Sequence, residues 1–136
     1  MGEIKNINHV AIVVSDLDAA VKFWSDGLGI PLSHIEDVPS QSAKVAFLPV
    51  GSSEIELVFP TDENCGTAKF LKERGAGMHH LCIEVDCLED VMADLKAKGI
   101  RLTSDTPAIL EGRKVVFIHP KSALGVLVEL YQPIDV

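Results

Sequence analysis

The sequence predicts an α+β domain built from two tandem modules, each with the order strand, helix and three strands. The first observation is an internal repeat, because residues 9–12 (HVAI) reappear as residues 80–83 (HLCI), an offset of 80 − 9 = 71. The second is that a helix-like segment follows each copy. The third is size, since 136 residues with 47% apolar content suit one compact domain. We expect one domain over 1–136, with modules at 5–60 and 78–133 and a linker at 61–77.

Composition restricts the classes of partner. The chain has 12 basic and 20 acidic residues, so its net charge is 12 − 20 = −8, which argues against a surface for nucleic acid or an anionic membrane. Its longest apolar runs are strand-sized, far short of the roughly 20 residues of a membrane helix. The chain has three cysteines without a CxxC pair, and its start is not a basic segment followed by an apolar stretch. These two observations predict a cytoplasmic protein with reduced thiols.

The two predicted helices follow the first strand of each module. Each shows an apolar stripe at i, i+3, i+4 and i+7, which is typical of a helix with one buried face. Each also begins with a predicted cap, Ser15 with Asp18 and Asp86 with Glu89, and ends at a glycine. We therefore expect the stripe residues, Trp24 included, to be core. The stripes are Leu17, Ala20, Val21 and Trp24 in the first helix, and Leu88, Val91, Met92 and Leu95 in the second.

The later strands repeat less closely. Phe47 matches Phe117 at an offset of 117 − 47 = 70, and residues 55–57 (IEL) match residues 128–130 (VEL) at an offset of 128 − 55 = 73. The second copy therefore has 73 − 70 = 3 extra residues, in the loop around 121–124. The last strand is expected to align Val126, Val128 and Leu130 on one face. Between the modules, a turn from Thr61 leads into a predicted short helix near 68–74.

Strand alternation predicts a metal site. Because one face of each strand packs on a helix, the other face carries His9, Glu56, His80 and Glu129. A lone His or Glu is usually a surface residue, but a symmetric set of two imidazoles and two carboxylates favours metal ligation. Nitrogen and oxygen donors suit Co, Ni, Mn, Fe or Zn, with two positions left open in octahedral coordination. Cys82 shares this face, either as a fifth ligand or as a small buried apolar residue.

From about residue 7 to 132 the chain resembles the vicinal oxygen chelate superfamily, which is glyoxalase, bleomycin-resistance and extradiol-dioxygenase-like. Its paired βαβββ modules form a curved, metal-binding cleft. Within the superfamily the chain is most similar to the methylmalonyl-CoA epimerases, through the double-histidine stretch and the His-Pro-Lys-Ser loop. The matching stretches are residues 9–12, 45–51, 55–57, 77–86, 119–122 and 125–130.

This resemblance implies a metal-dependent isomerase that interconverts (2R)- and (2S)-methylmalonyl-CoA through a metal-stabilised enolate, in a homodimer. It implies Glu129 as a base. Residues 42–46 carry no carboxylate where some relatives have one, so the second acid/base is Glu56 or a water. Lys121 and Ser122 are candidates for binding the substrate carboxylate or the CoA phosphates, or are solvated loop residues.

The choice of His80 over His79 as a ligand rests on alignment with His9 and on strand alternation. His79 is then expected to face the helix side or to cap the strand.

Two other functions remain open. A glyoxalase I-like lactoylglutathione lyase would use the same four ligands on the hemithioacetal of glutathione and methylglyoxal. A non-catalytic small-molecule-binding module of the same fold is the second alternative, which missing ligands would favour. An extradiol dioxygenase fits less well, because it uses two His and one carboxylate with iron.

Overall fold

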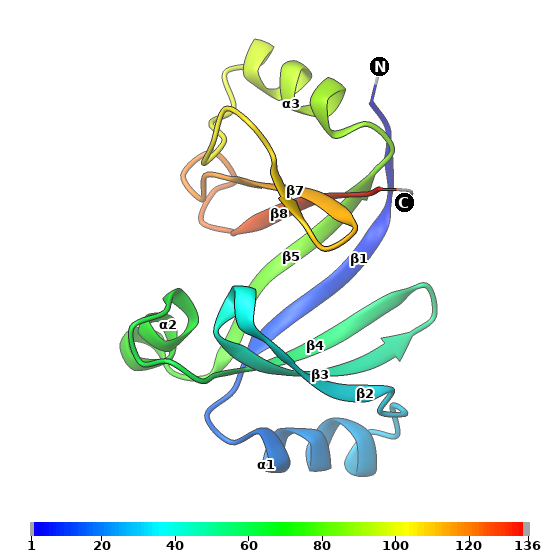
Figure 1. Cartoon of the computed structure of the whole chain (residues 1–136), viewed down its shortest axis with the longest axis vertical. Helices are drawn as coiled ribbons and strands as arrows, with labels where there is room; N and C mark the ends of the chain where they lie inside the picture. The colour runs from blue at the N-terminus through cyan, green and yellow to red at the C-terminus, as the bar shows by residue number, and fades with distance from the viewer. Residues whose placement is uncertain (1, 135–136) are drawn as a thin grey trace. The chain divides into compact units, whose positions relative to one another are not determined.

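A computed structural model describes residues 2–134 of the chain, which divide into two compact units. The N-terminal unit contains residues 9–79, and the C-terminal unit contains the described residues up to Asn8 together with those from His80 onward. The elements follow the order strand, helix, three strands twice, with one short helix between the repeats (Figure 1). The predicted fold class is therefore confirmed.

The N-terminal unit contains four strands in the order β2-β3-β4-β1, of which β1 and β4 run parallel and the other neighbours antiparallel. Helix α1 and its continuation η1, a π-helix, lie along one face of these strands (Figure 1). Residues 4–8 of β1 belong to the C-terminal unit. The elements are β1 (Ile4–Val13), α1 (Leu17–Val21), η1 (Lys22–Gly27), β2 (His34–Val38), the 3-10 helix η2 (Pro39–Gln41), β3 (Ala43–Val50), β4 (Ser53–Pro60) and α2 (Gly66–Arg74).

The C-terminal unit has the matching order β5-β8-β7-β6, with β5 and β8 parallel and the remaining pairs antiparallel. Helix α3 contacts β8. The first residues of β5, up to His79, fall in the N-terminal unit. The elements are β5 (Gly77–Val85), α3 (Leu88–Ala97), β6 (Ala108–Leu110), β7 (Arg113–Ile118) and β8 (Val128–Pro133).

Each unit buries the predicted helix stripe against alternate residues of its strands. In the N-terminal unit Leu17 and Trp24 pack with Leu57 of β4. In the C-terminal unit Leu88 and Met92 pack with residues of β5, β7 and β8. The predicted core helices, including Trp24, are confirmed. Since these side chains occupy one face of each set of strands, the residues between them lie on the other face.

The predicted cap of the first helix is wrong. The N-cap of α1 is Asp16 rather than Ser15, and the Asp16 carboxylate accepts a hydrogen bond from the Ala19 N–H at 3.0 Å. Ser15 and Asp16 are both good capping residues. Because Asp16 is the one that caps α1, the helix begins one residue later than predicted. The sequence pattern alone does not separate adjacent candidates.

The predicted cap of the second helix is also wrong, for a tertiary reason. The N-cap of α3 is Cys87. The Asp86 carboxylate instead accepts a hydrogen bond from the Glu3 N–H at 2.7 Å, and this bond lowers the pKa of Asp86. The Leu88 N–H at the start of α3 donates to Gln132 Oε1 at 2.7 Å. A distant side chain therefore satisfies the helix terminus.

The last strand begins later than predicted. Strand β8 starts at Val128, and Val126 lies in a turn with 51% of its surface exposed, so its predicted core alignment is wrong. The cause is a compact turn in which Gly125 has φ +98° and its N–H donates to the Pro120 carbonyl. The predicted three-residue excess falls in this turn, and the predicted linker helix is present as α2.

Across residues 2–134, no helix has the length and apolar character that crossing a membrane requires.

Candidate metal centre

His9 and Glu56 meet within the N-terminal unit. Strands β1 and β4 are parallel with Ala11 opposite Glu56, and Leu57 points into the helix-side core, so Glu56 occupies the other face. His9 Nδ1 lies 3.1 Å from Glu56 Oε2, and the two side chains are 10% and 12% exposed. This first pair of predicted residues therefore offers a nitrogen and an oxygen donor side by side in a nearly buried position.

His80 and Glu129 form the equivalent pair in the C-terminal unit. His80 Nε2 lies 3.1 Å from Glu129 Oε1, and the side chains are 14% and 9% exposed. Glu129 stands opposite Phe117 on β7, whose ring meets the His80 ring edge-on at 5.7 Å between centroids. The His80 imidazole therefore contacts both the Glu129 carboxylate and the Phe117 ring. Both pairs thus have the same separation and similar burial, as the repeat predicts.

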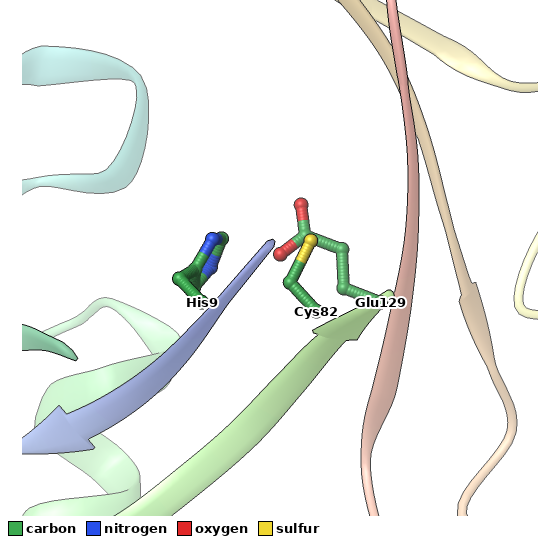
Figure 2. Close-up of side chains that lie close together, drawn as sticks. All are labelled: His9, Cys82 and Glu129. Atoms are coloured by element: carbon green, nitrogen blue, oxygen red, sulfur yellow. The ribbon is translucent and has the colours of Figure 1, made fainter. Parts of the chain in front are cut away.

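Cys82 stands directly opposite Glu129 on the neighbouring strand and is fully buried. Its Sγ and a carboxylate oxygen of Glu129 are within 4.8 Å of each other. Figure 2 shows the Cys82 thiol beside the Glu129 carboxylate. The position suits either of the two roles predicted for Cys82.

A second polar row lies two residues beyond Glu129 on the same face. Glu84 of β5 stands opposite Tyr131 of β8, and the Asn8 amide donates to Glu84 Oε1 at 3.4 Å. Burial raises the pKa of Tyr131, and the charges of Glu84 and Glu129 raise it further against the opposing charge of Arg113. Strand alternation explains why Glu84 and Tyr131 share the face of Cys82 and Glu129, but the sequence pattern assigns neither residue a role.

Lys121 and Ser122 lie in the turn between β7 and β8. Ser122 Oγ accepts a hydrogen bond from the Arg101 N–H at 2.9 Å, which ties this turn to the segment after α3. The Lys121 N–H donates to His119 Nδ1 at 3.1 Å, and the Lys121 side chain is exposed. Ser122 therefore has a structural contact, and the predicted contact of both residues with substrate stays a prediction.

His79 faces a helix, as the choice of His80 requires. Its ring packs edge-on against Phe70 of α2 with centroids 5.0 Å apart. His79 and His80 thus point to different neighbours, because successive residues of a strand alternate between its faces.

The donors present fit a divalent cation. Each unit supplies one imidazole nitrogen and one carboxylate oxygen, 3.1 Å apart, in a nearly buried position. Buried carboxylates are rare unless they are paired or bind a metal. Nitrogen and oxygen donors of this kind suit first-row divalent ions.

Relatives in other organisms match the chain over most of its length. The mitochondrial methylmalonyl-CoA epimerase of Mus musculus is 41% identical over 96% of this chain and 74% of its own length. The ethylmalonyl-CoA/methylmalonyl-CoA epimerase of Cereibacter sphaeroides is 39% identical over 95% of this chain and 98% of its own. A probable chloroplastic lactoylglutathione lyase of Arabidopsis thaliana is 31% identical over 91% of this chain but 35% of its own length.

Solved structures agree with this comparison. The methylmalonyl-CoA epimerase of Mycobacterium tuberculosis superposes with a TM-score of 0.87 at 37% identity, over 97% of this chain and 90% of its own. A methylmalonyl-CoA epimerase in complex with methylmalonyl-CoA and NH4+ has the same TM-score at 31% identity, over 98% of both chains. A family model matches residues 8–117. The chain therefore belongs to the Glyoxalase/Bleomycin resistance protein/Dioxygenase superfamily.

Proposed function

We propose that this protein is a divalent-metal-dependent epimerase that interconverts (2R)- and (2S)-methylmalonyl-CoA. The observation that carries the proposal is the duplicated pair of an imidazole and a carboxylate, each with a 3.1 Å contact. The similarity to epimerases over nearly the whole chain supports the substrate class, and one of those structures contains methylmalonyl-CoA.

His9, Glu56, His80 and Glu129 are the proposed ligands of one cation, which is Co, Ni, Mn, Fe or Zn. Two carboxylates and two neutral imidazoles give a net charge of −2, which a divalent cation neutralises. When bound, the cation would supply electrostatic stabilisation for the negative charge that develops on the substrate oxygens as the C2 proton leaves. Four protein ligands would leave the cation able to bind the oxygens of the substrate carboxylate and thioester carbonyl.

Glu129 is the proposed base that removes the C2 proton. Its carboxylate is buried and lies beside the His80 imidazole, which fixes one of its oxygens. A positioned carboxylate of this kind contributes about 10²- to 10⁴-fold to a proton-transfer step. On the sequence alone, the second acid/base is Glu56 or a water molecule.

Other parts of the proposal concern binding and assembly. Lys121 supplies an exposed cationic side chain for the substrate carboxylate or the CoA phosphates, and Ser122 holds the turn that presents it. A homodimer is expected from the family. None of the three cysteines forms a disulfide in the part of the chain that the structure describes, which agrees with a reducing compartment such as the cytoplasm.

The test is to compare kcat/KM of the metal-loaded protein for methylmalonyl-CoA and for the methylglyoxal–glutathione hemithioacetal. Epimerisation that exceeds lyase turnover by at least about tenfold, a difference of 1.36 kcal/mol, supports the proposal. The opposite ratio assigns the protein to the lactoylglutathione lyases. Metal binding without turnover of either substrate favours the binding-module alternative.

A further inference from the structure

The proposed reaction needs a second proton-transfer group. An epimerase removes the C2 proton from one face of the substrate carbon and returns a proton to the other. Glu129 serves one face, and the residues at 42–46 that precede and begin β3 contain no carboxylate. The second group is therefore sought among other carboxylates on the strand face that carries Glu129. Glu84 is such a carboxylate in the C-terminal unit.

Strand pairing fixes the side of the sheet on which Glu84 lies. Its neighbours Ile83 and Val85 pack in the helix-side core with Leu130. Glu84 therefore points to the opposite face, the one that carries Cys82 and Glu129.

The spacing suits two groups on either side of one carbon atom. Glu84 is two residues beyond Cys82, the direct partner of Glu129. Neighbouring strands are about 4.8 Å apart and a parallel strand rises about 3.3 Å per residue, which separates the two Cα atoms by about 8 Å. Groups that contact a reacting carbon from opposite faces at about 3–3.5 Å each are about 6–7 Å apart. Two glutamate side chains from these positions span that separation.

The surroundings hold Glu84 in place without removing it from solvent. The side chain is half-buried, and one carboxylate oxygen accepts a hydrogen bond from the Asn8 amide at 3.4 Å. The other neighbour on this face is Tyr131, directly opposite on β8. Partial exposure gives water access to the carboxyl group.

We propose that Glu84 is the second acid/base, a catalytic residue whose carboxyl group contacts C2 on the face opposite Glu129; this inference rests on the proposed epimerase function. In one direction the Glu129 carboxylate takes the C2 proton, and the C–H electron pair moves into the thioester carbonyl to give an enolate. The enolate carbon then takes the proton of the Glu84 carboxylic acid, which becomes a carboxylate. The opposite epimer reacts through the same steps with the two roles exchanged, so the protons balance.

This assignment leaves Glu56 with a ligand role only. Glu56 Oε2 is 3.1 Å from His9 Nδ1, a contact equivalent to that of Glu129 with His80. Glu56 would thus hold a bound cation and offset its charge, while Glu129 would act on the substrate proton. Glu84 is outside the proposed ligand set and is free of that constraint.

The test compares Glu84→Gln with the wild type in deuterated water, starting from each pure epimer and measuring both C2 deuterium content and stereochemistry. The variant keeps the side-chain volume and loses the transferable proton. The matched control is Glu73→Gln, at an exposed position of α2. Metal content and Tm of all variants show whether the fold and the cation site are intact.

We expect Glu84→Gln to slow interconversion by about 10²- to 10⁴-fold, with unchanged metal content. One epimer should still exchange its C2 hydrogen for deuterium without inversion, because Glu129 acts alone on that face, and the other epimer should be inert. Glu84→Asp should recover part of the interconversion. A purely structural role of Glu84 would slow both exchange reactions together.

Three results would overturn the inference. The first is interconversion of the epimers by Glu84→Gln at the wild-type rate. The second is an equal loss of C2 deuterium exchange from both epimers in Glu84→Gln. The third is C2 exchange from one epimer alone in Glu56→Gln but not in Glu84→Gln. A wild-type protein that neither exchanges nor interconverts the epimers refutes the proposed function as well, and this result is recognised before any variant is compared.

Discussion

The two buried glutamates provide a matched pair of perturbations, Glu56→Gln and Glu129→Gln. Each carboxylate lies 3.1 Å from an imidazole nitrogen, and the exposed fractions of the two side chains are 12% and 9%. Glutamine has nearly the same volume as glutamate, so each change removes one charge without creating a cavity. The structural consequences of the two substitutions should therefore be equal.

The expected magnitudes follow from this equivalence. Each variant weakens one hydrogen bond to a charged group, a loss of about 1.5–3 kcal/mol, and removes one charge from the proposed ligand set. Metal affinity and Tm should fall by similar amounts in both. Only Glu129 is assigned to remove the C2 proton, so Glu129→Gln should lose a further 10²- to 10⁴-fold in kcat, or about 2.7–5.4 kcal/mol.

The assay is steady-state epimerisation with saturating metal, with bound metal measured on the same samples. We expect kcat of Glu129→Gln to be at least about 10²-fold below that of Glu56→Gln at equal metal occupancy. Equal kcat values at equal occupancy would refute the assignment of Glu129 as the base. A larger loss for Glu56→Gln would assign that role to Glu56.

Three further predictions concern the thiols and the core. Burial alone would raise the pKa of Cys65, but hydrogen bonds from the Thr67 hydroxyl and nearby backbone N–H groups outweigh burial and lower this pKa below the ordinary value of 9.0. Alkylation of Cys65 by iodoacetamide should therefore have a midpoint below pH 9. The variant Thr67→Val should raise that midpoint. Cys82→Ala should keep its metal content and leave the absorption spectrum of the cobalt-loaded protein unchanged, because we expect Cys82 to serve as a small buried apolar residue. Loss of a sulfur-to-metal absorption band in the variant would instead make Cys82 a ligand. Leu88→Ala should lower the free energy of unfolding in urea by about 2–5 kcal/mol, because Leu88 is fully buried. Leu124→Ala, at a position 94% exposed, should lower it by no more than about 0.5 kcal/mol. Similar losses from both variants would contradict the packing described.

Local periodicity in the sequence predicted the elements that depend on it. The apolar stripes of α1 and α3 and the alternation in β1, β4 and β5 require only the residues of each element, and the structure confirms them. The internal repeat predicted that each module carries one His and one Glu on the face away from its helix, and the structure brings each such pair into contact.

Features that depend on distant segments could not be predicted in the same way. Asp86 is a residue type that often caps helices, but its carboxylate accepts a hydrogen bond from the Glu3 N–H instead. The Gln132 side chain accepts the hydrogen bond from the N–H at the start of α3. The start of β8 depends on the turn that closes at Gly125. Alternation along β5 puts Glu84 on the face of Cys82, but its relation to Glu129 appears only with the register of β5 and β8.

In the proposed mechanism a bound cation and a glutamate together labilise the C2 proton of a methylmalonyl thioester. The decisive measurement is deuterium incorporation at C2 of methylmalonyl-CoA by the wild-type protein in deuterated water, before chelation, after chelation and after cobalt is restored. We expect incorporation accompanied by interconversion of the epimers, loss of both on chelation, and recovery of both with cobalt. Incorporation and interconversion that persist at full rate in the chelated protein, with no metal detected, would show that the reaction needs no cation.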